Sequence, residues 1–203
     1  MKIIETKRAP NPRRVRIFLA EKGIAVEFEQ IDIMQLDQRS PAFSALNPLQ
    51  QVPVLVLDDG ATISESVAIC RYFEDVQPQP ALLGTTPLER ATIEMWNRRI
   101  ELGLFLPIAQ CFRHTHPAMA ALEVPQIAAW GEANRGRVAQ LLRVLDTELA
   151  RRPYIAGERL SIADITALVA VDFMKPARLT MPEGLTHVQR WHAAVSARPS
   201  ARA

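Results

Sequence analysis

Two positions where a helix is expected to begin carry polar side chains that could bind a charged ligand. Ser66 starts a helical pattern, so its hydroxyl and backbone N–H lie where the free amides and the dipole of a helix attract an anion such as a carboxylate. Glu65, directly before it, can pair with a positive charge on the same ligand. Asn11 can donate a side-chain N–H at another helix start. All three side chains also suit ordinary helix caps and first-turn charges, and that interpretation stays open.

The composition excludes several other kinds of site. The chain has 24 basic and 22 acidic residues, a formal charge of +2, and therefore no strong field for nucleic acid. Cys70 and Cys111 are far apart in the sequence and form no C-x-x-C pair, which argues against a disulfide framework and a zinc site. His114 and His116 occupy a proline-bounded loop without a third ligand. We therefore expect no metal.

The N-terminus and the hydropathy pattern favour a cytoplasmic protein. Residues 1–5 contain no apolar core of signal-peptide length, and no stretch approaches the roughly 18 apolar residues of a membrane span. We therefore expect no membrane partner. We also expect no nucleic-acid partner, because no aromatic residues lie among the run of basic residues near the N-terminus. That run is interpreted as a solvated face and comprises Lys7, Arg8, Arg13, Arg14 and Arg16.

The first 77 residues predict alternating strands and helices. A strand from Ile3 leads into a helix for which Asn11 is the expected N-cap, Pro12 the first helical residue and Gly23 the end. A strand over 25–33 follows, although its apolar residues change parity between Phe28 and Ile31.

A short helix near residues 42–46 precedes a hairpin over 54–63, since Asp59 and Gly60 suit its turn. A helix that Pro78 closes comes next. This order predicts one mixed four-stranded sheet with helices on its faces, a thioredoxin-like topology of the α/β class.

Every element expected after the connector at 78–85 is helical, so we predict an all-α domain over 86–203. Thr86 and Glu89 form a capping box for a helix to about Cys111, kinked at Pro107. A second box, Ser161 to Asp164, starts a helix closer to the C-terminus. Between them, one helix carries an apolar stripe with a single polar member: Ile127, Trp130, Asn134, Val138, Leu141, Leu145 and Leu149.

Four segments together resemble the cytosolic glutathione transferase family over nearly the whole chain. They are the first-loop sequence APNPRRV at 9–15, NPLQQVP at 47–53, SES at 64–66 and the capping box SIAD at 161–164. The resemblance implies a thioredoxin-like domain over 1–77, a helical domain over 86–203, and a transferase that conjugates glutathione to small electrophiles in detoxification. It also implies a homodimer, with glutathione as co-substrate.

The resemblance assigns parts of glutathione to residues in order along the chain. Ser66 is expected to hold the γ-glutamyl carboxylate, and Glu65 the ammonium. A cis bond before Pro53 would leave the backbone of Val52 free to pair with the cysteinyl part, as an added strand does. For the glycine carboxylate the family often has Lys or His, whereas this chain offers neutral amides, from which we expect weaker affinity: Gln38, Gln50 and Gln51.

The first loop departs most from the family pattern. A thiol with a pKa near 8.5 is only a few per cent ionised at neutral pH, so the enzyme must stabilise the thiolate. The usual Tyr, Ser or Cys is absent here, and Asn11 is the main candidate, with Thr6 as the alternative. The Ala-Pro-Asn setting resembles the nu-type and the fungal prion-type regulator branches, and the missing Cys argues against protein-thiol redox chemistry.

Two alternatives to a transferase stay open. One is a glutathione-dependent peroxide or disulfide reductase; the other is a binding or regulatory protein with this fold and no catalysis. The zeta-type isomerase is disfavoured because its Ser-Ser-Cys loop is absent. The electrophile is expected against the first helix of the second domain, near Met95, Trp96, Arg99 and Ile100.

Overall fold

The computed structural model describes all residues, 1–203, and the chain divides into two compact units. The first contains residues 1–82 together with 199–203, and the second contains residues 83–198. The division falls within the connector expected at 78–85. The last five residues lie with the first unit, whereas the sequence suggested that they belong to the helical domain.

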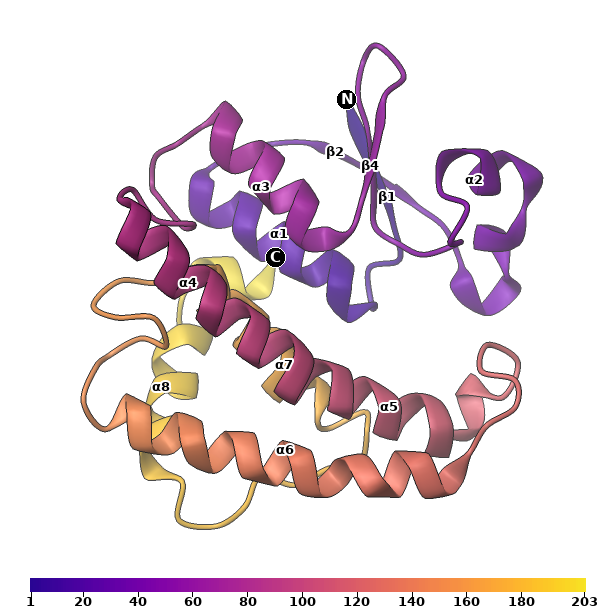
Figure 1. The fold of residues 1–203 in the computed structure, drawn as a ribbon. Helices are drawn as coiled ribbons and strands as arrows, with labels where there is room; N and C mark the ends of the chain where they lie inside the picture. Colours follow the sequence, from indigo (N-terminus) through magenta and orange to yellow (C-terminus); the bar gives the residue numbers. More distant parts are fainter. The chain divides into compact units, whose positions relative to one another are not determined.

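The first unit is built on a four-stranded sheet in the order β2-β1-β3-β4 (Figure 1). Strand β1 (Lys2–Glu5) pairs in parallel with β2 (Glu27–Gln30) and antiparallel with β3 (Val54–Val56), which pairs antiparallel with β4 (Thr62–Ser64). The thioredoxin-like topology predicted from the βα order and the hairpin is thereby confirmed.

Three α-helices complete the first unit. They are α1 (Pro10–Lys22), α2 (Pro41–Leu46) and α3 (Ser66–Val76), and α1 and α3 lie side by side (Figure 1). Helix α1 ends at Gly23, which has the positive φ of 66° typical of a helix C-cap. Short 3₁₀ turns occupy 33–35, 37–39 and 199–202.

Two predictions for the first unit were wrong in detail. Helix α1 begins at Pro10 with Ala9 as its N-cap, because a proline needs no N–H partner in the first turn and has a helical φ. Asn11 is therefore inside the helix and does not cap it. Strand β2 is much shorter than 25–33, because the chain turns into a 3₁₀ helix after the parity change near Ile31.

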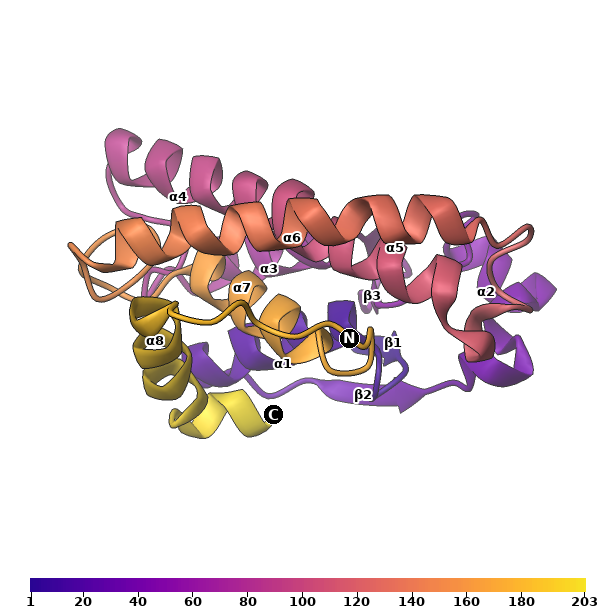
Figure 2. The ribbon, with the colours of Figure 1, turned by 90° about the horizontal axis from the view of Figure 1, so that it is seen from below.

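The second unit contains the remaining helices: α4 (Pro87–Ile100), α5 (Leu106–Thr115), α6 (Ala128–Leu149), α7 (Ile162–Phe173) and α8 (Thr186–Ser196). Helices α5 and α6 run alongside each other (Figure 2). Helix α7 is buried along its length, since every residue from Ile162 to Val171 is buried. No helix in the chain is both long and apolar enough to cross a bilayer.

Both capping boxes form as predicted. The Thr86 hydroxyl accepts from the Glu89 amide, and Asp164 reaches back to the Ser161 amide at 3.0 Å. Asp164 is fully buried and also accepts from the indole N–H of Trp191 at 2.9 Å. Its carboxylate therefore caps α7 and also joins the start of α7 to α8.

The expected helix from Pro87 to about Cys111 is interrupted by a π-helical turn at Glu101–Phe105. Pro107 follows it and cannot donate to the carbonyl of Gly103, so a local change of hydrogen-bond pattern is the expected response. The predicted apolar stripe of α6 also fails at its start. Ile127 and Trp130 are 53% and 43% exposed, because they lie at the entry of α6, where the Trp130 indole donates to Gln110.

Candidate functional site

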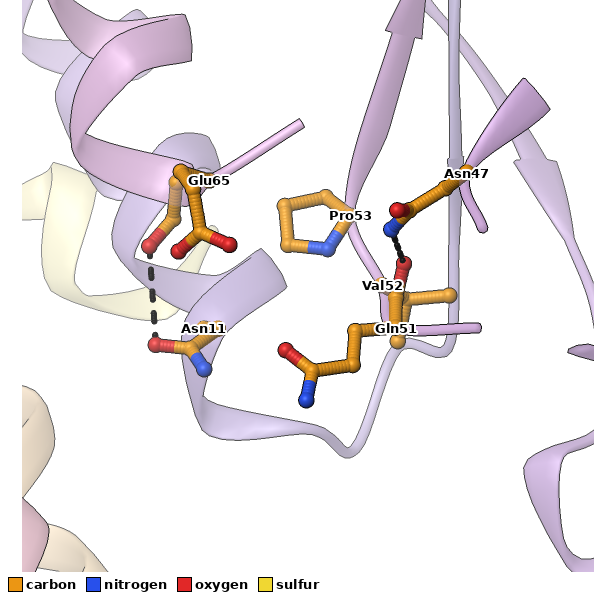
Figure 3. Close-up of a pocket in the computed structure, with 7 residues that line it drawn as sticks. Asn11, Asn47, Gln51, Val52, Pro53 and Glu65 are labelled. Atoms are coloured by element: carbon orange, nitrogen blue, oxygen red, sulfur yellow. Dashed lines mark hydrogen bonds between the residues drawn. The ribbon is translucent and has the colours of Figure 1, made fainter. Parts of the chain in front are cut away.

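A cavity of about 220 Å³, which includes space open to solvent, is lined by seven residues of the first unit (Figure 3). Its walls come from the start of α1, the loop before β3 and the turn between β4 and α3. The lining residues are Asn11, Asn47, Gln51, Val52, Pro53, Glu65 and Ser66. All of these except Asn47 are positions chosen for site chemistry from the sequence, so six predicted site residues meet here.

Asn11 contributes a side-chain amide to the cavity. It is the second residue of α1, and the structure shows no side-chain cap for that helix, so the capping role considered for Asn11 is not used. Asn11 Oδ1 accepts from the Ser66 hydroxyl at 3.5 Å. Asn11 Nδ2 points away from that contact, toward Gln51 across the cavity (Figure 3). The group that faces the open space is therefore a hydrogen-bond donor.

Glu65 and Ser66 form the turn that starts α3. Glu65 has φ 68° and ψ 114°, a conformation that costs a non-glycine residue of order 1–3 kcal/mol. Its backbone carbonyl still accepts the first helical bond, from Ile69, at 3.0 Å. The Glu65 carboxylate is exposed and faces the cavity, while Ser66 is buried at the helix N-terminus (Figure 3). An acidic group and a helix start with free donors thus lie side by side.

The loop before β3 presents backbone to the cavity. The Val52–Pro53 bond is cis, as the family resemblance implies. Pairing in the sheet begins only at Val54, two residues after Val52. The Val52 amide and carbonyl therefore make no hydrogen bond within the protein. These two groups are available to an extended ligand.

Asn47 is a lining residue that sequence reasoning did not assign to the site. It is buried, its Nδ2 donates to the Gln51 carbonyl at 2.8 Å, and its Oδ1 accepts from the Leu49 amide at 3.1 Å. These bonds hold the loop that carries Gln51 and Val52. Its place at the head of the NPLQQVP motif was the available signal, since Asn commonly bonds backbone groups two residues on.

Of the three glutamines predicted for the glycine end of a ligand, only Gln51 lines the cavity. Gln50 has a positive φ of 54°, and its Nε2 donates to the Ser44 hydroxyl of α2 at 2.9 Å. Gln38 is buried in the second 3₁₀ turn, and its Oε1 has no hydrogen-bond partner. The geometry therefore brings Gln51 to the site and leaves the other two outside its walls.

Thr6, the alternative thiolate-stabilising residue, does not line the cavity. Its hydroxyl donates to the Ile31 carbonyl at 2.7 Å, which ties the end of β1 to the chain after β2. Because the Thr6 hydroxyl hydrogen is already bonded to a carbonyl, Asn11 is the better candidate to donate to a thiolate.

Arg14 contradicts the interpretation of the basic run as a solvated face. Its side chain is only 1% exposed, and its Nη1 donates to the Ser66 hydroxyl at 3.2 Å. The spacing could have revealed it: Arg14, Phe18 and Lys22 are four apart and lie on one face of α1, and all three are buried. A guanidinium thus lies directly behind a residue of the cavity wall.

The residues expected to contact an electrophile belong to α4, in the other unit. Trp96 and Ile100 are buried, whereas Met95 and Arg99 are exposed. Arg99 and Arg152 both lie over the Trp96 ring, at 4.7 and 4.8 Å from its centroid. Only Met95 and Arg99 therefore offer side chains to solvent. The chain brings together no group of three or more His, Cys, Asp or Glu residues suited to a metal.

Comparison with known proteins places these features in a family. The family model of the glutathione S-transferase N-terminal domain matches residues 9–76, and that of the glutathione S-transferase C-terminal domain matches residues 105–199. Glutathione S-transferase 2 of Saccharomyces cerevisiae is 38% identical over 205 residues, covering 100% of this chain and 88% of that protein.

Two further relatives bear on the chemistry and the fold. A maleylacetoacetate isomerase of Pseudomonas aeruginosa is 41% identical over 174 residues, 81% of this chain and 77% of that protein. The crystal structure of a glutathione S-transferase domain-containing protein from Marinobacter aquaeolei superposes with a TM-score of 0.96 at 41% identity, covering 98% of this chain and 99% of that one.

Proposed function

The chain belongs to the glutathione S-transferase family, and on that premise we propose that it conjugates the thiol of glutathione to small electrophiles, with Asn11 stabilising the thiolate. The observation that carries this proposal is the Asn11 amide. Its oxygen is occupied by the Ser66 hydroxyl, and its Nδ2 faces the cavity from the positive end of α1. A donor in that position lowers the energy of an anion more than that of a neutral thiol.

Glutathione would lie across the cavity with its γ-glutamyl end at α3. The backbone N–H of Ser66 would hold the α-carboxylate, while the Ser66 hydroxyl donates to Asn11 Oδ1, and the exposed Glu65 carboxylate would pair with the ammonium. The unpaired Val52 amide and carbonyl would bond the cysteinyl backbone like an added strand. Gln51 would donate to the glycine carboxylate, with Gln38 and Gln50 supporting that end of the site. Because no cation is assigned there, we expect modest affinity.

The transfer itself needs little beyond orientation and a stabilised anion. The thiol proton leaves to solvent, the sulfur lone pair attacks the electrophilic carbon, a C–S bond forms, and a leaving group such as chloride departs with its bonding electrons. Donor stabilisation by Asn11 raises the fraction of the nucleophilic form at neutral pH, and fixed geometry replaces a bimolecular encounter. We propose contacts for the electrophile from Met95 and Arg99 of α4, with Trp96 and Ile100 packed behind them.

We further propose that the protein acts as a cytoplasmic homodimer. Leu88 of α4 and Leu102 of the π-helical turn after it carry large apolar side chains that are 77% and 60% exposed. Exposed apolar side chains of this size are candidates for burial between two copies of the chain. Sedimentation of the purified protein at micromolar concentration tests this: a single 23 kDa species would contradict the dimer.

The main test pairs a glutathione titration by calorimetry with conjugation of chlorodinitrobenzene, a chromogenic aryl halide. We expect micromolar to millimolar binding by the wild type, and a fall in kcat/KM of about 10²-fold in Asn11→Ala, in line with the loss of one donor to a developing anion. Asn11→Asp should be worse, because it places a carboxylate of the same shape beside the thiolate. Gln140→Ala, an exposed amide on α6, is the control and should keep wild-type rates.

The other outcomes separate the remaining alternatives. Binding without conjugation, accompanied by reduction of peroxides or small disulfides, would favour the glutathione-dependent reductase. Absence of glutathione binding would contradict the enzyme proposal and favour a regulatory or binding protein.

A second candidate, an isomerase, is favoured by one finding, the 41% identity to the maleylacetoacetate isomerase. The same bound thiolate could add to a conjugated carbon–carbon double bond, allow rotation and leave again, with no net consumption of glutathione. Against it stands the first loop, whose residues 6–11 contain no Ser-Ser-Cys sequence. Glutathione-dependent isomerisation of maleylacetone at a rate exceeding that of conjugation would favour this candidate.

A further inference from the structure

Three side chains form a line of hydrogen bonds from the buried interface of α1 and α3 to the cavity. Arg14 Nη1 donates to Ser66 Oγ at 3.2 Å, and Ser66 Oγ donates to Asn11 Oδ1 at 3.5 Å. Arg14 is behind the wall and does not line the cavity, whereas Ser66 and Asn11 do. The line therefore connects a buried charge to the residue proposed to face the sulfur.

The chemistry of the three groups gives this line a direction. A guanidinium can only donate, so the Ser66 oxygen must accept from Arg14. The single hydroxyl hydrogen of Ser66 is then left for another acceptor, and Asn11 Oδ1 is the acceptor within reach. With its oxygen engaged, the Asn11 amide presents its N–H groups to the cavity.

We propose that Arg14 is a positioning residue for this site: by donating to Ser66 it directs the hydroxyl hydrogen onto Asn11 Oδ1 and so holds the Asn11 amide with its N–H groups toward the bound sulfur. The proposal rests on the proposed function, because it assigns to Arg14 control over the donor that stabilises the thiolate. Without Arg14, Ser66 could accept from Asn11 instead. The amide could then turn over and present its oxygen to the sulfur, which repels an anion.

The surroundings of Arg14 fit a role through Ser66. Along α3, Ser66, Cys70 and Glu74 are four apart and all buried, and Arg14 and Lys22 of α1 contact the first and the last of them. Burial raises the pKa of the Cys70 thiol to about 12, and the Arg14 charge opposes that rise. At the cavity itself the titratable lining group is Glu65, which is acidic. A positive charge behind Ser66 thus balances an acidic group on the open side of the site.

The test measures the pKa of bound glutathione directly. At saturating glutathione, thiolate absorbance near 240 nm is followed against pH for the wild type, Arg14→Met and Arg8→Met, alongside the pH profile of kcat/KM for chlorodinitrobenzene. Arg8 belongs to the same basic run and is exposed, so Arg8→Met removes a like charge as a matched control. We expect Arg14→Met to raise the bound-thiol pKa by about one unit, and so to lower the thiolate fraction about tenfold below that pKa.

The results that would overturn the proposal are separate from those that would overturn the proposed function. A wild type with a depressed thiol pKa, and a folded Arg14→Met with the same pKa, would disprove the role of Arg14 alone. A wild type with no depression of the thiol pKa and no conjugation would disprove the function as well.

Two more variants keep the test informative if Arg14→Met fails to fold. Ser66→Ala breaks the line at its centre, so we expect the bound-thiol pKa to rise by the same amount at saturating glutathione. An unchanged pKa with weaker binding would show that Ser66 only holds the carboxylate, and would overturn the proposal. In an Asn11→Ala background, Arg14→Lys should cause no further shift of the pH profile; a full additional shift would contradict action through Asn11.

Discussion

The two ends of the α1–α3 interface place buried cations in contrasting surroundings. At one end, Arg14 bonds the neutral hydroxyl of Ser66, which belongs to the cavity wall. At the other, Lys22 forms an ion pair with Glu74 at 2.7 Å and also donates to the carbonyls of Gln77 and Pro80 at 2.6 and 2.8 Å. The cations are eight residues apart and 1% and 4% exposed.

This contrast separates a structural charge from the one that we propose to be functional. All three ammonium hydrogens of Lys22 have acceptors, and Glu74 in turn accepts from the Leu82 amide at 2.9 Å. That cluster joins α1, α3 and the connector, and none of its groups lines the cavity. At the other end, Arg14 donates to the Ser66 hydroxyl, and Ser66 lines the cavity. Burial of a cation is therefore weak evidence for function unless its partner reaches a site.

The largest effect is expected from breaking the structural end. Lys22→Met removes the cation that faces the buried Glu74 carboxylate, and breaking a buried ion pair in this way typically costs about 3–5 kcal/mol in the free energy of unfolding. Urea unfolding measures this change. The double variant Lys22→Met, Glu74→Met should recover most of the loss, because both charges are gone. The pH profile of kcat/KM, measured on the folded fraction of Lys22→Met, should match that of the wild type. A shift like the one expected for Arg14→Met would show that both cations act on the site.

A smaller change in stability and a larger change in binding are expected at the functional end. Ser66→Ala removes one acceptor of Arg14, at a cost of about 1–3 kcal/mol in unfolding free energy. The same change should weaken glutathione binding about tenfold, since Asn11 is then no longer held with its N–H groups toward the proposed position of the sulfur. Urea unfolding and calorimetry on the same preparation compare the two. Loss of stability with full glutathione affinity would mean that Ser66 is structural, like Glu74.

Cys70, between the two ends, gives the smallest effect near neutral pH. Its pKa of about 12 lies above the ordinary value of 9.0, so the folded protein keeps a proton that the unfolded chain loses above pH 9. Stability should therefore fall as pH rises from 9 toward 12, by at most about 1.4 kcal/mol per pH unit from this group. Cys70→Ala should flatten that slope, measured as urea midpoints at pH 8, 9 and 10. Burial also raises the pKa of the Cys111 thiol, so Cys111→Ala should flatten the slope less than Cys70→Ala does. If Cys111→Ala alone flattens the slope, Cys70 is not the responsible thiol.

The sequence was sufficient for the topology because turns and helix ends have local signatures. Asp59 and Gly60 predicted the hairpin, Gly23 the end of α1, and Ser161 with Asp164 the start of α7, and each of these features depends on residues close in the chain. The loop motif around Pro53 was assigned to the site by the family resemblance, and its residues Asn47, Gln51, Val52 and Pro53 line the cavity. Local chemistry thus predicted the order of elements, and the resemblance supplied the candidate site.

The features that were missed depend on packing between elements. Arg14 was interpreted as exposed because it belongs to a run of basic residues, and only the spacing to Phe18 and Lys22 indicated burial. The start of α1 was placed two residues late, because Pro10 and Pro12 both suit the first turn of a helix. Asn11 does not cap α1 because the helix already begins at Pro10, and its contact with Ser66 joins residues 55 positions apart, which no local pattern contains.

The turn at Pro199–Arg202 makes the first unit discontinuous in sequence, with the helical unit inserted into it. Ala201 accepts a hydrogen bond from Arg13 at 3.1 Å, and Ser200 bonds Glu21, so the last residues brace the helix that carries Asn11 (Figure 1). A fragment ending at residue 82 would lack this brace. A circular permutant that joins 199–203 to the native N-terminus through a short linker would make the unit contiguous and is the rational form in which to study it alone.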